Sequence, residues 1–138
     1  MDYGFICYLY LTGMLAHRLG DILFQPKSWA ISKSNPGLKG SLVCTAHVLA
    51  YTFFIILLWA TASPAIFCAI AIPHWVIDRT SLANKWAKII QGRTFEAAAI
   101  STHKYREFDV AFTCIVYKDA DEALHRLCLW VVIIYLMV

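Results

Sequence analysis

Three histidine–aspartate pairs are the residues of this sequence whose types and spacing could do chemistry. The two members of each pair stand four positions apart: His17–Asp21, His74–Asp78 and Asp121–His125. Residues four apart on a helix lie one turn apart on the same face, so both side chains can reach one ion or each other. Three such pairs among the five histidines would arise by chance in roughly one comparable sequence in 150.

Neutral imidazole and carboxylate are the usual protein ligands of zinc, iron and manganese. A fourth histidine, His47, lies inside the longest apolar run and joins the three pairs as a candidate ligand. This set exceeds what a single ion needs, so we expect a divalent metal centre of one or two ions, two of which would activate a bridging water. Two alternatives remain open at this stage. Each aspartate could instead hydrogen-bond its own histidine and close a polar helix interface, or the groups could line a proton or ion pathway.

An arginine adjoins each pair: Arg18, Arg79 and Arg126. Guanidinium suits bidentate binding of phosphate, so these side chains are candidates for holding an anionic, phosphate-bearing substrate beside the metal. Anchoring on the phosphates of membrane lipids is an equally good interpretation. His103 has no acidic residue four positions away and is interpreted as a surface histidine.

The composition predicts an integral membrane protein. Of the 138 residues, 60% are hydrophobic and 15% are charged, and the mean hydropathy is +0.61. A small soluble domain could not bury that much apolar surface. The net charge of +3 comes without a basic stripe interleaved with aromatic residues, so no nucleic-acid partner is expected. The five cysteines include no C-x-x-C pair and are interpreted as small hydrophobic residues.

The segments that must position the pairs are helical spans. We predict one all-α membrane domain over residues 1–138, a four-helix bundle with interfacial amphipathic helices between spans three and four. The spans are expected at about 3–24, 41–62, 65–79 and 120–138, of lengths that suit a bilayer or its edge. The third span starts at the Ser63-Pro64 turn, contains Pro73, and is expected to continue through Asp78 toward Lys85.

The connecting segments differ in character. Residues 25–40 are rich in turn residues and predict a loop with one short helix. The interfacial segment, 80–118, begins with one or two surface helices over 80–108. Its last part, 109–118, is too short to span a membrane, and its pattern leaves helix and strand both open.

The basic residues predict an orientation that can be tested against the pairs. Segments 25–40 and 79–120 carry most of the lysines and arginines, so the positive-inside rule places both in the cytoplasm of an inner (cytoplasmic) membrane protein. Both termini and the 62–64 turn are then outside. In this orientation all the candidate ligands lie at a similar depth in the membrane, near its cytoplasmic face. The loop charges that predict the orientation are independent of the His/Asp spacing that indicates the ligands.

The same residues form an ordered motif that resembles the domain-of-unknown-function 3307 family of small bacterial and phage membrane proteins. The matching positions are His17, Asp21, Gln25, Trp29, Lys33, His47, His74, Asp78, Asp121 and His125. Glu122 departs from the glutamine that is usual in the family and could add a carboxylate near the site. Gln25 and Lys33, as motif residues, join the three arginines as predicted substrate-binding residues. The family is similar in style to membrane-bound metal-dependent hydrolases.

Two functional hypotheses follow. The first is a metal-dependent hydrolase of a phosphoester or lipid-linked substrate at the cytoplasmic leaflet, with ligands from all four spans and one carboxylate left free as a general base. The second is a non-enzymatic accessory or phage-encoded subunit of a larger membrane complex, held together by a structural His/Asp cluster. A pathway would need polar groups that continue to the outer face, where only Thr45, Thr52 and Thr61 are available.

Overall fold

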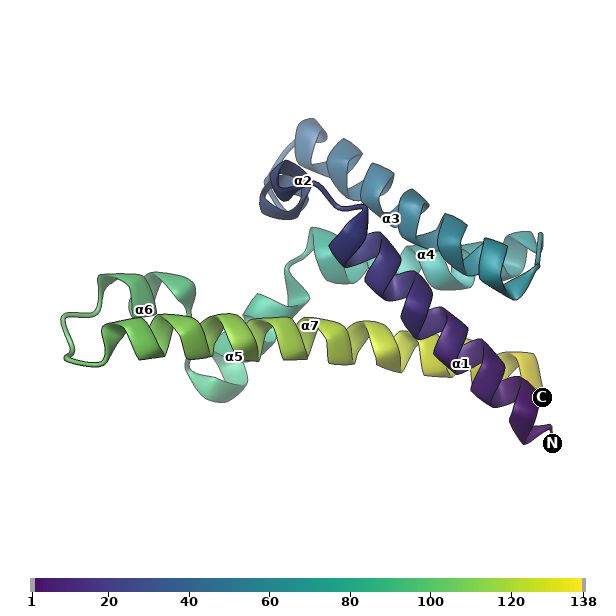
Figure 1. Ribbon diagram of the computed structural model, residues 1–138. Helices are drawn as coiled ribbons and strands as arrows, with labels where there is room; N and C mark the ends of the chain where they lie inside the picture. The colour runs from purple at the N-terminus through teal and green to yellow at the C-terminus, as the bar shows by residue number, and fades with distance from the viewer. Residues whose placement is uncertain (1, 138) are drawn as a thin grey trace.

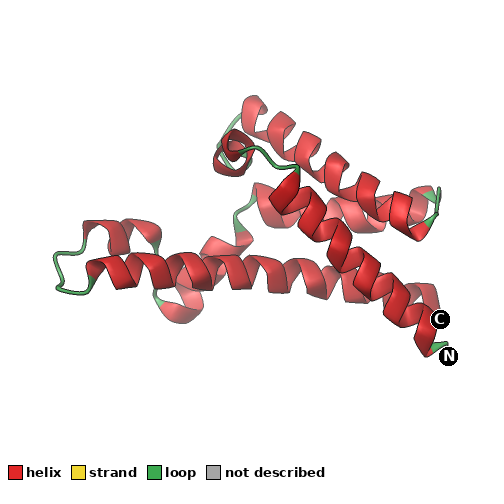
Figure 2. Ribbon diagram, in the orientation of Figure 1, coloured by secondary structure: helices red, strands yellow, loops and turns green. Residues whose placement is uncertain are grey.

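The computed structural model describes residues 2–137, and every regular element within them is helical (Figure 2). The elements in chain order are α1 (Tyr3–Arg18), the π-helical turn η1 (Leu19–Leu23), α2 (Lys27–Ser32), α3 (Leu38–Trp59), α4 (Pro64–Arg79), α5 (Leu82–Gln91), α6 (Phe95–Ile100) and α7 (Arg106–Met137). The predicted all-α class is confirmed. Val138, the last residue of the predicted fourth span, and Met1 lie outside the described residues.

The four long helices form a ring in which α1 contacts α3, α3 contacts α4, α4 contacts α7, and α7 contacts α1. Both termini and the α3–α4 turn lie toward the same end of the molecule (Figure 1). Helix α2 lies at the opposite end of α3, while α5 and α6 pack along the N-terminal half of α7. Within residues 2–137, only α3 is long and apolar enough to cross a membrane. Of the four predicted spans, therefore, only the second coincides with such a helix, and a four-span bundle is not confirmed.

Local signals explain where the helices begin and end. Asp2 caps α1 by accepting a hydrogen bond from Phe5 N at 3.1 Å, as N-cap carboxylates do. Ser63 caps α4 in the same way, with Pro64 in its first turn, so the predicted start of the third span is confirmed. Helix α4 ends at Arg79, and the expected continuation toward Lys85 is wrong. Ser81 adopts a left-handed conformation (φ 49°) that terminates α4 before α5 begins.

The segment left open by the sequence, 109–118, is helical and belongs to α7. This helix runs for 32 residues from Arg106 to Met137 and contains no glycine or proline to interrupt it. The Lys118–Glu122 pair, at i and i+4, spans the point where the sequence suggested a boundary. Residues 80–108 contain the two short helices α5 and α6, in agreement with the expected one or two.

The interior of the bundle has two distinct halves. Toward the termini it is an apolar cluster that includes Leu9, Ile55, Leu129 and Ile133. The indole N–H of Trp59 donates to the carbonyl of Leu9 at 3.0 Å and joins α3 to α1 there. Toward α2, the same four helices turn histidines and carboxylates inward.

Candidate metal centre

All seven predicted ligands converge in the polar half of the bundle. They come from α1 (His17), η1 (Asp21), α3 (His47), α4 (His74 and Asp78) and α7 (Asp121 and His125). The four histidines and Asp78 are buried. Asp21 and Asp121 are each partly covered, with side chains 12% and 19% exposed. The structure therefore contains a His/Asp cluster, as the spacing of the pairs predicted.

The π-helical turn places Asp21 across the helix interface. Its wider winding is closed by the hydrogen bond from Phe24 N to the carbonyl of Leu19 at 2.9 Å, and such turns are frequent at functional sites. Gly20 lies within this turn, where a Cβ would stand 2.9 Å from the Cα of Tyr51. The missing side chain thus lets η1 pack directly on α3, and Asp21 Oδ1 comes 3.3 Å from His47 Nε2.

Two of the three predicted pairs meet within their own helical segments. His17 Nε2 lies 3.3 Å from Asp21 Oδ2, and His74 Nε2 lies 3.3 Å from Asp78 Oδ2. The third pair meets differently. His125 Nδ1 donates to the backbone carbonyl of Asp121 at 2.8 Å, and its distance to the Asp121 carboxylate is 3.8 Å.

That backbone hydrogen bond fixes the chemistry of His125. With the proton on Nδ1, Nε2 carries the lone pair, and this buried atom has no hydrogen-bond partner within residues 2–137. Backbone bonds of this kind orient metal-ligating histidines in general. A buried lone pair without a donor is an available metal ligand.

Contacts between helices are at least as close as those within the pairs. His47 Nε2 lies 3.1 Å from Asp78 Oδ2 and 3.2 Å from His74 Nε2. Atoms that bind one zinc ion at about 2.1 Å in tetrahedral geometry stand about 3.4 Å apart. The spacing of these nitrogen and oxygen atoms therefore fits a shared cation.

The donor atoms form two groups of three. One group is Asp21, His47 and His74, and the other is His74, Asp78 and His125; within each, the ligand atoms lie within 4.8 Å of one another. His74 is common to both groups.

The charge of the cluster also favours a cation. Asp21, Asp78 and Asp121 face one buried ammonium, Lys33, whose Nζ lies 2.8 Å from Asp78 Oδ1. Burial opposes the charged form of Lys33, but the nearby carboxylates of Asp78 and Asp21 outweigh it and raise the pKa of Lys33 above its ordinary value. With neutral histidines, the carboxylates then exceed the ammonium by two negative charges. Excess charge in such a place is costly unless a cation balances it.

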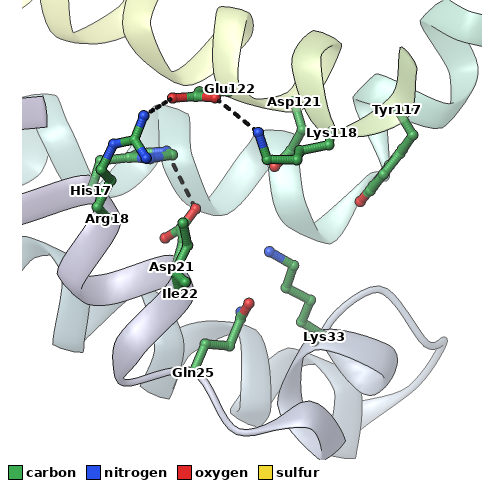
Figure 3. A pocket seen from close by; sticks show the side chains of 11 residues that line it. His17, Arg18, Asp21, Ile22, Gln25, Lys33, Tyr117, Lys118, Asp121 and Glu122 are labelled. Atoms are coloured by element: carbon green, nitrogen blue, oxygen red, sulfur yellow. Dashed lines mark hydrogen bonds and ion pairs between the residues drawn. The ribbon is translucent and has the colours of Figure 1, made fainter. Parts of the chain in front are cut away.

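A cavity of about 250 Å³ opens beside the cluster, between α1, η1, α2 and α7 (Figure 3). His17 and Asp21 belong both to its wall and to the cluster, so the cavity leads to the candidate ligands. Tyr117 stands on the α7 side, where burial raises the pKa of its hydroxyl to about 12. The phenol is therefore neutral and can donate a hydrogen bond to a bound molecule.

Basic side chains gather around Glu122 at the rim of this cavity. Arg18 Nη2 lies 3.8 Å and Lys118 Nζ lies 3.5 Å from the Glu122 carboxylate, as the dashed lines of Figure 3 show. Arg126 pairs with the same carboxylate. Exposed Asp119, 3.8 Å from Lys118, offsets part of the positive charge, but the rim keeps an excess of it. Such a rim attracts anions.

A family model for proteins of unknown function matches residues 9–138, almost the whole chain. The chain belongs to the domain-of-unknown-function 3307 family. The resemblance that the ordered His/Asp motif indicated is therefore confirmed. Neither the search of curated proteins nor the search of solved structures gave a match.

In this family member, the predicted substrate-binding residues lie in three places. Arg18, Gln25 and Lys33 line the cavity. Arg126 lies at the rim of the cavity, where it pairs with the Glu122 carboxylate. Arg79 instead donates to Ser41 Oγ and to the carbonyls of Ser34 and Gly37, and so holds the loop between α2 and α3.

Three residues at the site were missed by the sequence reasoning. Tyr117 and Lys118 line the cavity, and the ring of Tyr51 lies 4.2 Å from that of His74 between centroids. The first two stand four residues before Asp121 and Glu122, so extending the final helix through 109–118 would have found them. No local signal marks Tyr51, because it meets His74 only through helix packing.

Proposed function

We propose that this chain is a membrane-embedded, metal-dependent hydrolase of a phosphoester, free or lipid-linked, at the cytoplasmic leaflet. The observation that carries the proposal is the adjacency of two features. Buried imidazole and carboxylate atoms stand at ligand spacing, and a cavity with a basic rim opens onto them. The first feature suits zinc, manganese or iron, and the second suits a phosphate-bearing substrate.

The reaction is the addition of water to phosphorus with cleavage of the ester P–O bond. The water gives up a proton and the departing oxygen gains one, so the products are a phosphate and an alcohol. A divalent cation held by the cluster would lower the pKa of a bound water and supply the nucleophile near neutral pH.

The side chains of the cavity have distinct parts in this proposal. Arg18 and Lys118 bind the phosphate oxygens, and the neutral Tyr117 hydroxyl donates a hydrogen bond to the substrate. The Asp121 carboxylate stands 3.8 Å from its nearest imidazole nitrogen, His125 Nδ1, and lines the cavity. This carboxylate is therefore our candidate for the general base that accepts the proton from water.

The proposed membrane setting is supported by the apolar side chains that the four long helices expose on their outer faces. Each exposes large apolar side chains while burying ionisable ones: Leu11 and Leu15 on α1, Phe53 and Leu57 on α3, Ile72 and Val76 on α4, and Leu127 and Val131 on α7. A lipid environment would cover that surface. In this setting α5, with Ile89 and Ile90 exposed beside Lys85 and Lys88, lies at the interface. The cytoplasmic orientation rests on the basic loops alone.

The second candidate is the non-enzymatic subunit, and one observation favours it. Asp78 joins α3, α4 and Lys33 through contacts at 3.1, 3.3 and 2.8 Å. A cluster with these links could simply hold the helices together.

The deciding experiment is elemental analysis by mass spectrometry of detergent-purified protein prepared without chelator. Wild type is compared with His74→Ala and Asp78→Ala, and with His103→Ala as the matched control, because His103 is exposed and outside the cluster. We expect bound zinc, manganese or iron in wild type and His103→Ala and its loss in the other two. A screen of phosphoesters on the loaded wild type then tests the activity.

Metal-free wild-type protein, with His74→Ala and Asp78→Ala merely less stable, would reject the hydrolase and leave the structural subunit. Bound metal without turnover of any phosphoester would reject the reaction but keep the metal centre.

A further inference from the structure

We propose that the Lys33 ammonium takes the place of a second metal ion, so that this centre binds a single divalent cation. The inference rests on the proposed metal site and sharpens it, because the ligand set alone leaves one and two ions open. It also gives Lys33 a defined position, between the cluster and the substrate cavity.

The first step is the contact made by Lys33. Its Nζ lies 2.8 Å from Asp78 Oδ1, and the residue is only 7% exposed although lysine is rarely buried. The Asp78 oxygen 3.8 Å from His125 Nε2 is the same Oδ1. The ammonium thus occupies the carboxylate atom that a second ion would share with His125.

The second step is the sharing of His74 between the two donor groups. Its Nε2 lies 3.2 Å from His47 Nε2 and 3.8 Å from Asp21 Oδ1 in the first group, and 3.3 Å from Asp78 Oδ2 in the second. The same nitrogen therefore faces both groups. One imidazole nitrogen binds one ion. Once His74 serves the group with Asp21 and His47, the second group keeps only Asp78 and His125.

The third step is charge balance. Histidines that bind a metal are neutral, so in a loaded centre the ionised carboxylates of Asp21, Asp78 and Asp121 would exceed the Lys33 ammonium by two negative charges. One divalent cation cancels that excess, whereas two would leave the buried cluster positively charged. The site with Lys33 present is therefore matched to a single ion.

Lys33 has a second role, because it lines the cavity as well as contacting Asp78. In two-metal hydrolases the second ion also clamps the substrate oxygens. Here the ammonium presents a fixed positive charge to the same region, as a point charge with three donors. We therefore assign Lys33 to the binding of a phosphoryl oxygen beside the single ion.

The test is the zinc stoichiometry of the full chain in detergent, by equilibrium dialysis against ZnCl₂ and elemental analysis. We expect about one equivalent in wild type and about two in Lys33→Met, which keeps a long apolar stem but removes the charge. Lys33→Arg keeps the charge and should stay at about one equivalent. Lys27→Met is the matched control, since Lys27 is exposed on α2, the short helix that ends just before Lys33, and it should behave as wild type.

The outcomes separate this inference from the metal site itself. Two equivalents in wild type, or one in a folded Lys33→Met, would overturn the role of Lys33 while leaving the metal centre intact. No zinc in wild type would instead reject the centre on which it rests. If Lys33→Met does not fold, the electron paramagnetic resonance of Mn²⁺-loaded wild type decides, because an isolated ion and an exchange-coupled pair give different hyperfine patterns.

Discussion

The two halves of the bundle interior are built by the same four helices and hold together in different ways. The half toward the termini is held mainly by buried aliphatic side chains such as Ile55 and Ile133. There the Trp59 indole donates to Leu9 O and the Tyr8 hydroxyl donates to Leu58 O. This half is therefore closed by apolar packing with a few hydrogen bonds between helices.

The half toward α2 differs, because several of its buried polar atoms have no hydrogen-bond partner among the described residues. His17 Nε2, His125 Nε2 and Asp21 Oδ1 are such atoms, and all three face the cluster. Natural proteins leave few buried polar atoms unpaired, so a group of them calls for a bound species. Apolar packing is thus concentrated in one half of the bundle, and the candidate ligands are concentrated in the other.

The largest expected effect on stability comes from the apolar half. Ile55 is fully buried in α3, and Ile55→Ala should lower the free energy of unfolding by about 2–5 kcal/mol through lost burial and a cavity. Zinc stoichiometry should not change. Thermal unfolding in detergent, followed by circular dichroism beside metal analysis, measures both. A loss of bound zinc in the folded variant would show that the halves are not independent.

Zinc should stabilise the protein through the polar half alone. At a free concentration 100 times its dissociation constant, a ligand of the native state adds about 2.7 kcal/mol of stability. We expect the unfolding temperature of wild type to rise with ZnCl₂ and to fall back with EDTA, and that of His74→Ala to respond to neither. An equal response in both proteins would place zinc elsewhere.

A smaller loss is expected where η1 packs on α3. Gly20→Ala puts a Cβ 2.9 Å from the Tyr51 backbone, so the two segments must separate at a cost of about 1–3 kcal/mol. Because Asp21 moves with η1, zinc affinity should fall as well. Ala83→Gly, at a buried position of α5 outside the cluster, is a control that should lower stability without changing zinc affinity. Unchanged affinity in Gly20→Ala would mean that Asp21 is not a ligand.

The smallest change in stability is expected at the rim. Glu122→Gln frees Arg18, Lys118 and Arg126 from their common carboxylate and should strengthen the binding of inorganic phosphate several-fold, with stability altered by less than about 1 kcal/mol. Isothermal titration with phosphate measures the change, and the slope against salt concentration should steepen. Weaker binding in the variant would show that Glu122 organises the rim for its ligand.

The local part of the site was predictable because a helix fixes the positions of its own residues. The i and i+4 spacing was enough to bring His17 to Asp21 and His74 to Asp78, since one turn of helix separates them whatever surrounds it. The position of His47 inside the longest apolar run likewise made it a candidate ligand. The all-helical class followed from the same hydrophobic pattern.

The partners of Lys33 and Arg79 were not predictable, because their contacts join residues about 40 positions apart in the chain. The path of the loop between α2 and α3 decides that Lys33 enters the cluster while Arg79 turns back to hold the loop.

The sequence by itself determined the all-helical class, the i and i+4 pairs and the candidate ligands, since these depend on the types of residue and on their local spacing. Only the tertiary structure decided how the ligands are shared. The close approach of Gly20 to Tyr51 sets the distance between η1 and α3. That distance brings the Asp21 carboxylate into contact with the His47 imidazole. Such registers between helices depend on side-chain packing over the whole bundle, which no short stretch of sequence contains.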